Sequence, residues 1–203
     1  LALHVHGPGM FHSATKQIKS LADLKGMKVR GPTRQVTKML GAVGATPVGM
    51  PLPGIPDALS KGTIEACVIP WEVVPSVKVH ELTKFHSEFD NTGGALYTTT
   101  FVMAMNKAKY ESLPADLKKV IDANSGAATS AALGKQQQAN DAAGRKAAVD
   151  RGNTIYQFTA AQREEFVKLS AQIDDEWVAD MDKRGFKGAQ LLSTAKSLIA
   201  KYK

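Results

Sequence analysis

The chain has 203 residues, of which 43% are hydrophobic and 22% are charged, a composition typical of a soluble protein with one large or two modest domains. No segment approaches the roughly 18–20 consecutive apolar residues of a membrane-spanning helix, and the N-terminus lacks the pattern of a signal peptide. We therefore expect a protein that is not inserted in a membrane. Because the chain starts at Leu1 directly in a strand-like pattern, we also expect a truncated N-terminus.

The net charge of +7 raises the question of a nucleic-acid partner. The basic residues are scattered along predicted helices, without a Lys/Arg run, zinc-ligand spacing or alternation with aromatic residues. This distribution favours a solvated basic surface and no nucleic-acid partner. The single cysteine, Cys67, excludes an internal disulfide.

The first hundred residues alternate between strand and helix patterns. We expect a strand over 1–6, a turn at 7–9, a polar linker over 13–20, a helical turn over 21–26 and a strand over 27–30. A helix should begin after the N-cap Thr33, followed by an extended segment over 46–50. A helix over 55–61, a strand over 64–69 and a helix over 73–82 complete this half. Such alternation predicts an α/β fold with a mainly parallel sheet.

The second half is mostly helical in pattern. We expect a long strand over 96–105, a long helix over 113–150 bent near Gly126 and Gly134, a strand over 153–158, a helix after a capping box at Thr159 and a final helix over 191–202. The helix after Thr159 is predicted to bury Phe166, Leu169, Ile173, Trp177 and Met181, and the final helix carries Leu191, Ala195, Leu198 and Tyr202 on one stripe.

Motifs for nucleotide binding or nucleophilic catalysis are missing from the sequence. Neither G-x-G-x-x-G, nor G-x-x-x-x-G-K-[ST], nor G-x-S-x-G occurs. Cys67 lies within an apolar strand, where a thiol is usually a small core residue. We predict neither a cofactor nor a catalytic residue.

Three histidines near the N-terminus allow two interpretations. His4 and His6 point the same way on a strand and His12 follows closely, an arrangement that could hold a metal ion for a hydrolase. Since no Asp, Glu or Cys stands at a fixed spacing nearby, we favour a role of His6 in hydrogen bonding to a ligand.

Arg30 is the strongest candidate for binding a ligand. It ends a strand just before a turn and a helix N-terminus, where open α/β sheets bind their ligands. Its guanidinium suits a carboxylate, and free N–H groups near Thr33 would favour the same anion. Trp71 follows another strand and could close over the ligand. The alternatives are a structural arginine on the surface and a tryptophan of the core.

The sequence resembles the solute-binding proteins of tripartite ATP-independent periplasmic (TRAP) transporters, the dicarboxylate-binding-protein family. The resemblance covers nearly the whole chain. It is carried by the segments Leu21-Ala-Asp-Leu-Lys-Gly-Met-Lys-Val-Arg30, Leu40-Gly-Ala-Val-Gly-Ala-Thr-Pro-Val-Gly-Met50, Ala58-Leu-Ser-Lys-Gly-Thr-Ile-Glu65 and Met105-Asn-Lys-Ala-Lys-Tyr-Glu-Ser-Leu-Pro-Ala-Asp-Leu-Lys-Lys119.

This resemblance implies two α/β lobes around a cleft, strands that cross between the lobes, a long back helix and closure over the ligand. Residues 1–12 would be an inter-lobe strand, residues 13–95 the C-terminal lobe, and residues 96–203 the crossing strand, the long helix and the remaining elements, with the N-terminal lobe largely missing. Arg30 falls on the family's carboxylate clamp. The resemblance further implies a periplasmic transport protein rather than an enzyme, with a small carboxylate and the TRAP membrane subunits as partners.

Departures from the family bear on the ligand. Where the sugar-acid-binding branch has a second arginine, this chain has the segment from His6 to Met10, which disfavours a sugar acid. Leu52, Trp71 and Phe101 would form a pocket for a carboxylate with an apolar or aromatic body. A ligand-sensing lobe of a signalling system would use the same residues and is the remaining alternative besides the metal-assisted hydrolase.

Overall fold

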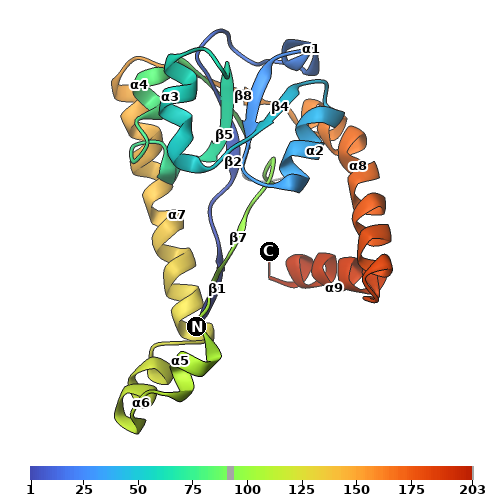
Figure 1. Ribbon diagram of the computed structural model, residues 1–203. Helices are drawn as coiled ribbons and strands as arrows, with labels where there is room; N and C mark the ends of the chain where they lie inside the picture. The colour runs from blue at the N-terminus through green and yellow to red at the C-terminus, as the bar shows by residue number, and fades with distance from the viewer. Residues whose placement is uncertain (91–93, 203) are drawn as a thin grey trace.

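A six-stranded sheet forms the centre of the computed structural model, which describes residues 1–90 and 94–202 (Figure 1). The strand order is β4-β3-β5-β2-β6-β8. These strands are β2 (Gly9–Ser13), β3 (Lys28–Gly31), β4 (Thr46–Gly49), β5 (Ala66–Pro70), β6 (Phe85–Phe89) and β8 (Thr154–Phe158). All neighbouring pairs are parallel except those of β2, which is antiparallel to both β5 and β6. The predicted α/β fold with a mainly parallel sheet is confirmed.

The strand β2 was not predicted from the sequence, where a turn was expected at 7–9 and a linker over 13–20 with no strand between them. All five residues of β2 are buried, because other strands flank it and side chains cover both faces of the sheet. A strand with two buried faces has no alternation of polar and apolar residues, so its pattern gave no signal. The strand β6 was missed as well.

Helices cover both faces of the sheet. They include α1 (Leu21–Leu24), α2 (Arg34–Ala42), η1 (Leu52–Gly54), α3 (Ile55–Ser60), η2 (Trp71–Val73) and α4 (Val79–Leu82). Phe11 belongs to the apolar cluster with α2, whereas the adjacent Met10 belongs to the cluster with α3 and Trp71. The predicted single helix over 73–82 is wrong, since Lys78 has a left-handed conformation with φ 53° and α4 begins only after it.

A separate two-stranded ribbon lies below the sheet in Figure 1. It pairs β1 (Ala2–Val5) with β7 (Thr100–Met103) in antiparallel register, so the predicted strand over 96–105 is shorter than expected. The predicted helix over 113–150 is split into α6 (Ala115–Ala123) and α7 (Ala127–Asp150), with α5 (Lys107–Glu111) before them. Gly126 separates the two with φ 87°, a conformation that favours glycine. No helix in the described ranges is long and apolar enough to span a membrane.

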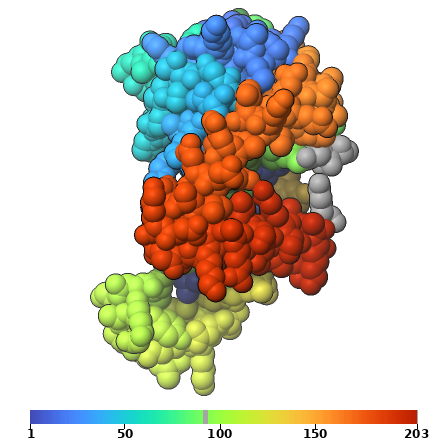
Figure 2. Space-filling view, turned by 90° about the vertical axis from the view of Figure 1, so that its right-hand side faces the viewer, coloured from blue at the N-terminus to red at the C-terminus, as the bar shows by residue number. Residues whose placement is uncertain are grey.

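The last two helices, α8 (Ala160–Lys183) and α9 (Gly188–Lys201), only partly follow the prediction. The capping box of Thr159 is confirmed, and Phe166 is buried. Leu169, however, is 40% exposed, Trp177 is only half-buried, and Leu191 and Leu198 of α9 are exposed. The reason is that α8 runs down from the sheet and packs mainly against α2 and α9, which leave much of its apolar stripe uncovered (Figures 1 and 2).

Candidate functional site

Arg30 is a buried cation at the carboxyl end of β3. Its side chain is 4% exposed, and its Nε and Nη1 donate hydrogen bonds to the backbone oxygens of Met50 at 3.0 Å and Val68 at 3.3 Å. Burial lowers the pKa of Arg30 from its ordinary value. Among residues 1–90 and 94–202, no carboxylate forms an ion pair with it. Buried charges in proteins are normally paired, so a buried guanidinium without a counter-ion is a suitable binding site for an anion.

Tyr97 lies directly beside Arg30 and was missed by the sequence analysis. Its hydroxyl donates a hydrogen bond to the Val68 oxygen at 3.0 Å, the same oxygen that Arg30 contacts. Burial raises the pKa of Tyr97. Gly9 allows this close approach, since a Cβ atom there would lie 2.0 Å from the tyrosine ring. The only sequence signal for Tyr97 was an aromatic residue near the start of a Thr-rich strand.

His6 and Phe101 continue from Tyr97 toward the ribbon. The His6 ring meets the edge of Tyr97 at 5.4 Å and lies 5.8 Å from Phe101, centroid to centroid. His6 is buried, whereas Phe101 is 40% exposed and stacks on His4. The structure therefore brings Arg30, Tyr97, His6 and Phe101 into one series of contacts.

Thr33 and Leu52, the other two residues predicted to contact a ligand, lie outside this series of contacts. Thr33 is the N-cap of α2, where its hydroxyl accepts a hydrogen bond from the Val36 N–H at 3.3 Å, and it lines a shallow hollow of about 510 Å³ together with Tyr97. Leu52 is partly buried and packs against the apolar cluster that contains Trp71. Their contact with a ligand stays a prediction.

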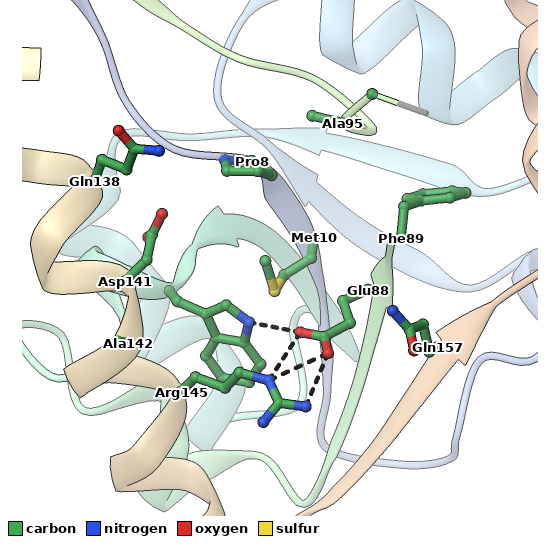
Figure 3. Close-up of a pocket in the computed structure, with 12 residues that line it drawn as sticks. Pro8, Met10, Glu88, Phe89, Ala95, Gln138, Asp141, Ala142, Arg145 and Gln157 are labelled. Carbon is green, nitrogen blue, oxygen red and sulfur yellow. Dashed lines mark hydrogen bonds and ion pairs between the residues drawn. The ribbon is translucent and has the colours of Figure 1, made fainter. Parts of the chain in front are cut away.

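A cavity of about 570 Å³ opens between β6, η2 and α7 (Figure 3). Trp71, 3% exposed, lies in its wall, and the indole Nε1 donates to Glu88 Oε2 at 2.9 Å. Arg145 of α7 binds Glu88 through Nη2 at 2.9 Å and through Nε at 3.2 Å. The lining mixes apolar and polar side chains: Pro8, Met10, Trp71, Phe89, Ala95 and Ala142 with Glu88, Gln138, Asp141, Arg145 and Gln157.

The cavity and Arg30 lie on either side of one chain segment. Gly94 and Ala95 line the cavity, and Tyr97 two residues later contacts the Arg30 group. Trp71 lines this cavity, whereas Arg30 lines neither the cavity nor the shallow hollow beside Thr33. Neither Glu88 nor Arg145 was identified from the sequence, because β6 was not predicted and Arg145 reads as one of many helical surface cations.

The histidines do not assemble a metal site. Within the described part of the chain, no group of three or more His, Cys, Asp or Glu side chains could hold a metal ion. His12 instead pairs with His86 in the sheet. Cys67 is fully buried, and burial raises the pKa of its thiol to about 12, so it is a core residue as predicted.

Comparison with known proteins places this geometry in a family. Residues 1–180 match the family described as bacterial extracellular solute-binding protein, family 7. The chain belongs to this family. Its α/β fold is that of solved TRAP solute-binding proteins, and the resemblance predicted from the sequence is confirmed.

Three similar proteins are informative. A TRAP solute-binding protein of Rhodoferax ferrireducens, solved in complex with copurified benzoate, is 67% identical, with a TM-score of 0.96 over 99% of this chain and 62% of that one. A marine metagenome TRAP solute-binding protein specific for aromatic acid ligands, solved with 3-hydroxybenzoate, is 48% identical, with a TM-score of 0.94 over 100% and 63% of the two chains. The protein TsaT of Comamonas testosteroni, named an outer membrane transporter protein, is 26% identical over 95% of this chain and 56% of its own length. This chain thus spans between half and two thirds of the length of these relatives.

Proposed function

We propose that this chain belongs to the periplasmic solute-binding component of a TRAP transporter, which binds an aromatic carboxylate and delivers it to the membrane subunits. Arg30 is the carboxylate clamp in this proposal. Closure over the ligand would follow from contacts that favour the closed arrangement of two lobes.

The observation that carries the proposal is the buried guanidinium of Arg30 without a carboxylate partner among the described residues. A bidentate carboxylate would supply the missing charge, and hydrogen bonds between charged partners are the strong ones. The relative that is 67% identical was solved with copurified benzoate, which supports a carboxylate on an aromatic ring.

The surroundings of Arg30 support the aromatic part of the proposal. Phe101 offers an exposed ring next to His6, and Trp71 forms a wall of the neighbouring cavity. Leu52 packs behind the same apolar cluster. Such a lining with a few polar groups suits a ring with a polar substituent better than a heavily hydroxylated sugar acid.

The proposed site needs protein from outside these 203 residues. The β1–β7 ribbon is only two strands wide, and Leu3, Val5 and Val102 are exposed on it. The ribbon packs on α7 through β1, where the Leu3 N–H donates to Ser130 Oγ at 3.0 Å, but its exposed apolar side chains remain uncovered. We propose that the N-terminal lobe of the relatives packs on them and forms the other wall of the cleft. The division of the chain into lobes after residues 12 and 95 is part of this proposal.

A thermal-shift experiment tests the function. The chain would be joined to the N-terminal portion of the 67% identical relative and heated with benzoate, 3-hydroxybenzoate, malonate and glucuronate. We expect the aromatic acids to raise the melting temperature most. No shift with any aromatic acid would contradict the proposal, whereas a response to glucuronate alone would identify a sugar-acid binder. Co-purification with integral membrane subunits would distinguish a transport protein from a sensor.

A further inference from the structure

Two histidines from adjacent central strands lie directly behind Trp71. His12 of β2 and His86 of β6 are opposite each other in the strand register, both are fully buried, and their Nδ1 atoms are 2.7 Å apart. The Trp71 ring packs on both imidazoles, at centroid distances of 5.0 Å and 4.9 Å. The position of the indole therefore depends on this pair.

The hydrogen bonds determine which nitrogen carries each proton. His12 Nε2 lies 3.1 Å from the Ile69 oxygen, which can only accept, so this nitrogen is protonated and His12 Nδ1 is an acceptor. His86 Nδ1 must then donate to it. His86 Nε2, 3.0 Å from the Asn153 side-chain nitrogen, accepts from that amide. Both rings are neutral, and each of the four ring nitrogens has a partner.

The Asn153 amide has a defined orientation. The same nitrogen lies 2.9 Å from the His80 backbone oxygen and 3.0 Å from that of Thr83, so this end of the amide is the NH2 group. Its two hydrogens are shared among these two oxygens and His86 Nε2. An additional proton could enter only at His12 Nδ1 or His86 Nε2. Each of these atoms faces an N–H group, so protonation would replace a hydrogen bond by a repulsive contact.

Other ionisable groups surround the pair without neutralising such a proton. His80 of α4 disfavours a positive charge on His86. Cys67 of β5 lies opposite His12 in the strand register, and its thiol is protonated and therefore uncharged. Across Trp71, the Glu88 carboxylate of β6 is already bound by Arg145 of α7. Glu72 of η2 interacts with Asp141 of α7: its backbone N–H donates a hydrogen bond to the Asp141 carboxylate at 3.0 Å.

We propose that the His12–His86 pair is an acid-sensitive support of Trp71. In its neutral form the pair holds the indole in the cavity wall; with one additional proton it releases the indole, and the affinity for the carboxylate ligand falls. The second half of this statement rests on the proposed function, because it assigns Trp71 to the ligand cavity. His12 and His86 are positioning residues that act through Trp71.

The electrostatics of the pair are consistent with this role. Burial lowers the pKa of His86 to about 4, with the charge of His80 adding to the effect, and burial and His86 lower the pKa of His12 well below its ordinary value. The pair thus stays neutral at neutral pH and is protonated only in acid.

Indole fluorescence tests the proposal without any ligand. Trp177→Phe leaves Trp71 as the only tryptophan, and we expect its emission maximum to shift to longer wavelength as the pH falls from about 6.5 toward about 4. Benzoate affinity, calculated on the concentration of the benzoate anion, should fall about twofold by about pH 4, where half of the His86 rings are protonated, and about tenfold one pH unit lower. An emission maximum that does not change before the protein unfolds would overturn the proposal.

The matched variant is His86→Asn, whose amide can replace the donor at Nδ1 but does not titrate. We expect its emission, and its affinity calculated on the concentration of the benzoate anion, to be independent of pH over this range, whereas His4→Gln keeps the wild-type emission midpoint. The same midpoint in His86→Asn would overturn the proposal. If no benzoate binds at neutral pH, the proposed function fails, and the emission midpoint still decides the support of Trp71.

A measurement on the unaltered side chains covers the case in which His86→Asn does not fold. Imidazole ¹H–¹⁵N correlation spectra should show the Nε2–H tautomer for His12 and the Nδ1–H tautomer for His86 at neutral pH. The signals of both neutral tautomers should disappear over the same pH range in which the emission maximum of Trp71 shifts. The opposite tautomers, or a charged ring at neutral pH, would contradict the proposal.

Discussion

Trp71 is tied to the long helix α7 through Glu88. The indole nitrogen donates to one carboxylate oxygen at 2.9 Å, and Arg145 binds the other at 2.9 Å (Figure 3). The ion pair thus connects β6 with α7 across the cavity. Because Arg145 is partly exposed, the ion pair itself contributes little stability, and its main effect is to orient the indole.

Replacing Trp71 by alanine should weaken the binding of aromatic acids selectively. Removing the ring takes away an apolar wall, which we expect to cost at least about 1.5 kcal/mol, or roughly tenfold in affinity, for benzoate. Malonate, which has no ring, should lose less. Calorimetric titration of both acids measures the difference, with Trp177→Phe as control. An equal loss for the two acids would assign Trp71 a purely structural role.

Gly144 allows α7 to pack closely on Trp71. A Cβ atom at this position would lie 1.9 Å from the Trp71 oxygen, so Gly144→Ala forces the helix away from η2. We expect a loss of about 1–3 kcal/mol in the free energy of unfolding, as in other overpacked sites. Gly134 in the same helix has no atom within 4 Å of such a Cβ, so Gly134→Ala should stabilise by about 0.5–1 kcal/mol. Urea unfolding measures both, and equal effects would refute the close packing.

The sheet order could be predicted only in part from the sequence. The alternating segments from β3 to β5 gave clear strand and helix patterns, because each strand is followed by a helix with a regular apolar spacing. β2 and β6 gave none, since both are central and short, and their residues include the polar His12, Ser13 and His86. The hydrogen-bond partners that make the burial of these polar groups possible come from distant parts of the chain.

The same limit applies to the site. Arg30 could be proposed as a candidate from the sequence because a strand end before a helix N-terminus is a local feature. Tyr97, Glu88 and Arg145 could not, since their importance depends on contacts between residues 17 to 57 positions apart. The burial expected for Leu169 was wrong for a related reason: helical spacing identifies an apolar stripe and not the element that covers it.

Cys67 should be unreactive in the folded protein. The thiol is fully buried, and burial raises its pKa to about 12, so almost no thiolate exists at neutral pH. We expect a thiol reagent to modify Cys67 only in denaturant, with a rate in native buffer limited by unfolding. Mass spectrometry of the modified protein measures this rate. Rapid modification in native buffer would show that β5 is accessible.

The stability of the fold should decrease in acid through the buried histidines. The folded pKa of His86 is about 4 and the unfolded value is about 6.5, so below the unfolded value the unfolded chain binds more protons. Each histidine then lowers the free energy of unfolding by up to about 1.4 kcal/mol per pH unit. This loss begins as the pH falls below about 6.5 and levels off near the folded pKa.

Glu72 and Asp141 act in the opposite direction, since burial raises the pKa of both carboxyl groups and the folded state then binds more protons. Urea unfolding of the wild type and of His86→Asn at a series of pH values isolates the histidine contribution as a difference. We expect the free energy of unfolding of the wild type, relative to that of His86→Asn, to increase toward neutral pH. A difference that does not depend on pH would contradict the buried neutral pair.

Calorimetric titration of benzoate into three proteins tests the carboxylate clamp most directly: the wild type, Arg30→Ala and Arg34→Ala, each joined to the N-terminal portion of the relative solved with benzoate. Arg34 is the matched control, an exposed arginine on the neighbouring helix α2 that pairs with Asp180 at 3.3 Å. We expect Arg34→Ala to bind as the wild type does and Arg30→Ala to lose at least about 3 kcal/mol, or more than a hundredfold in affinity. Unchanged benzoate affinity in a folded Arg30→Ala protein would contradict the account.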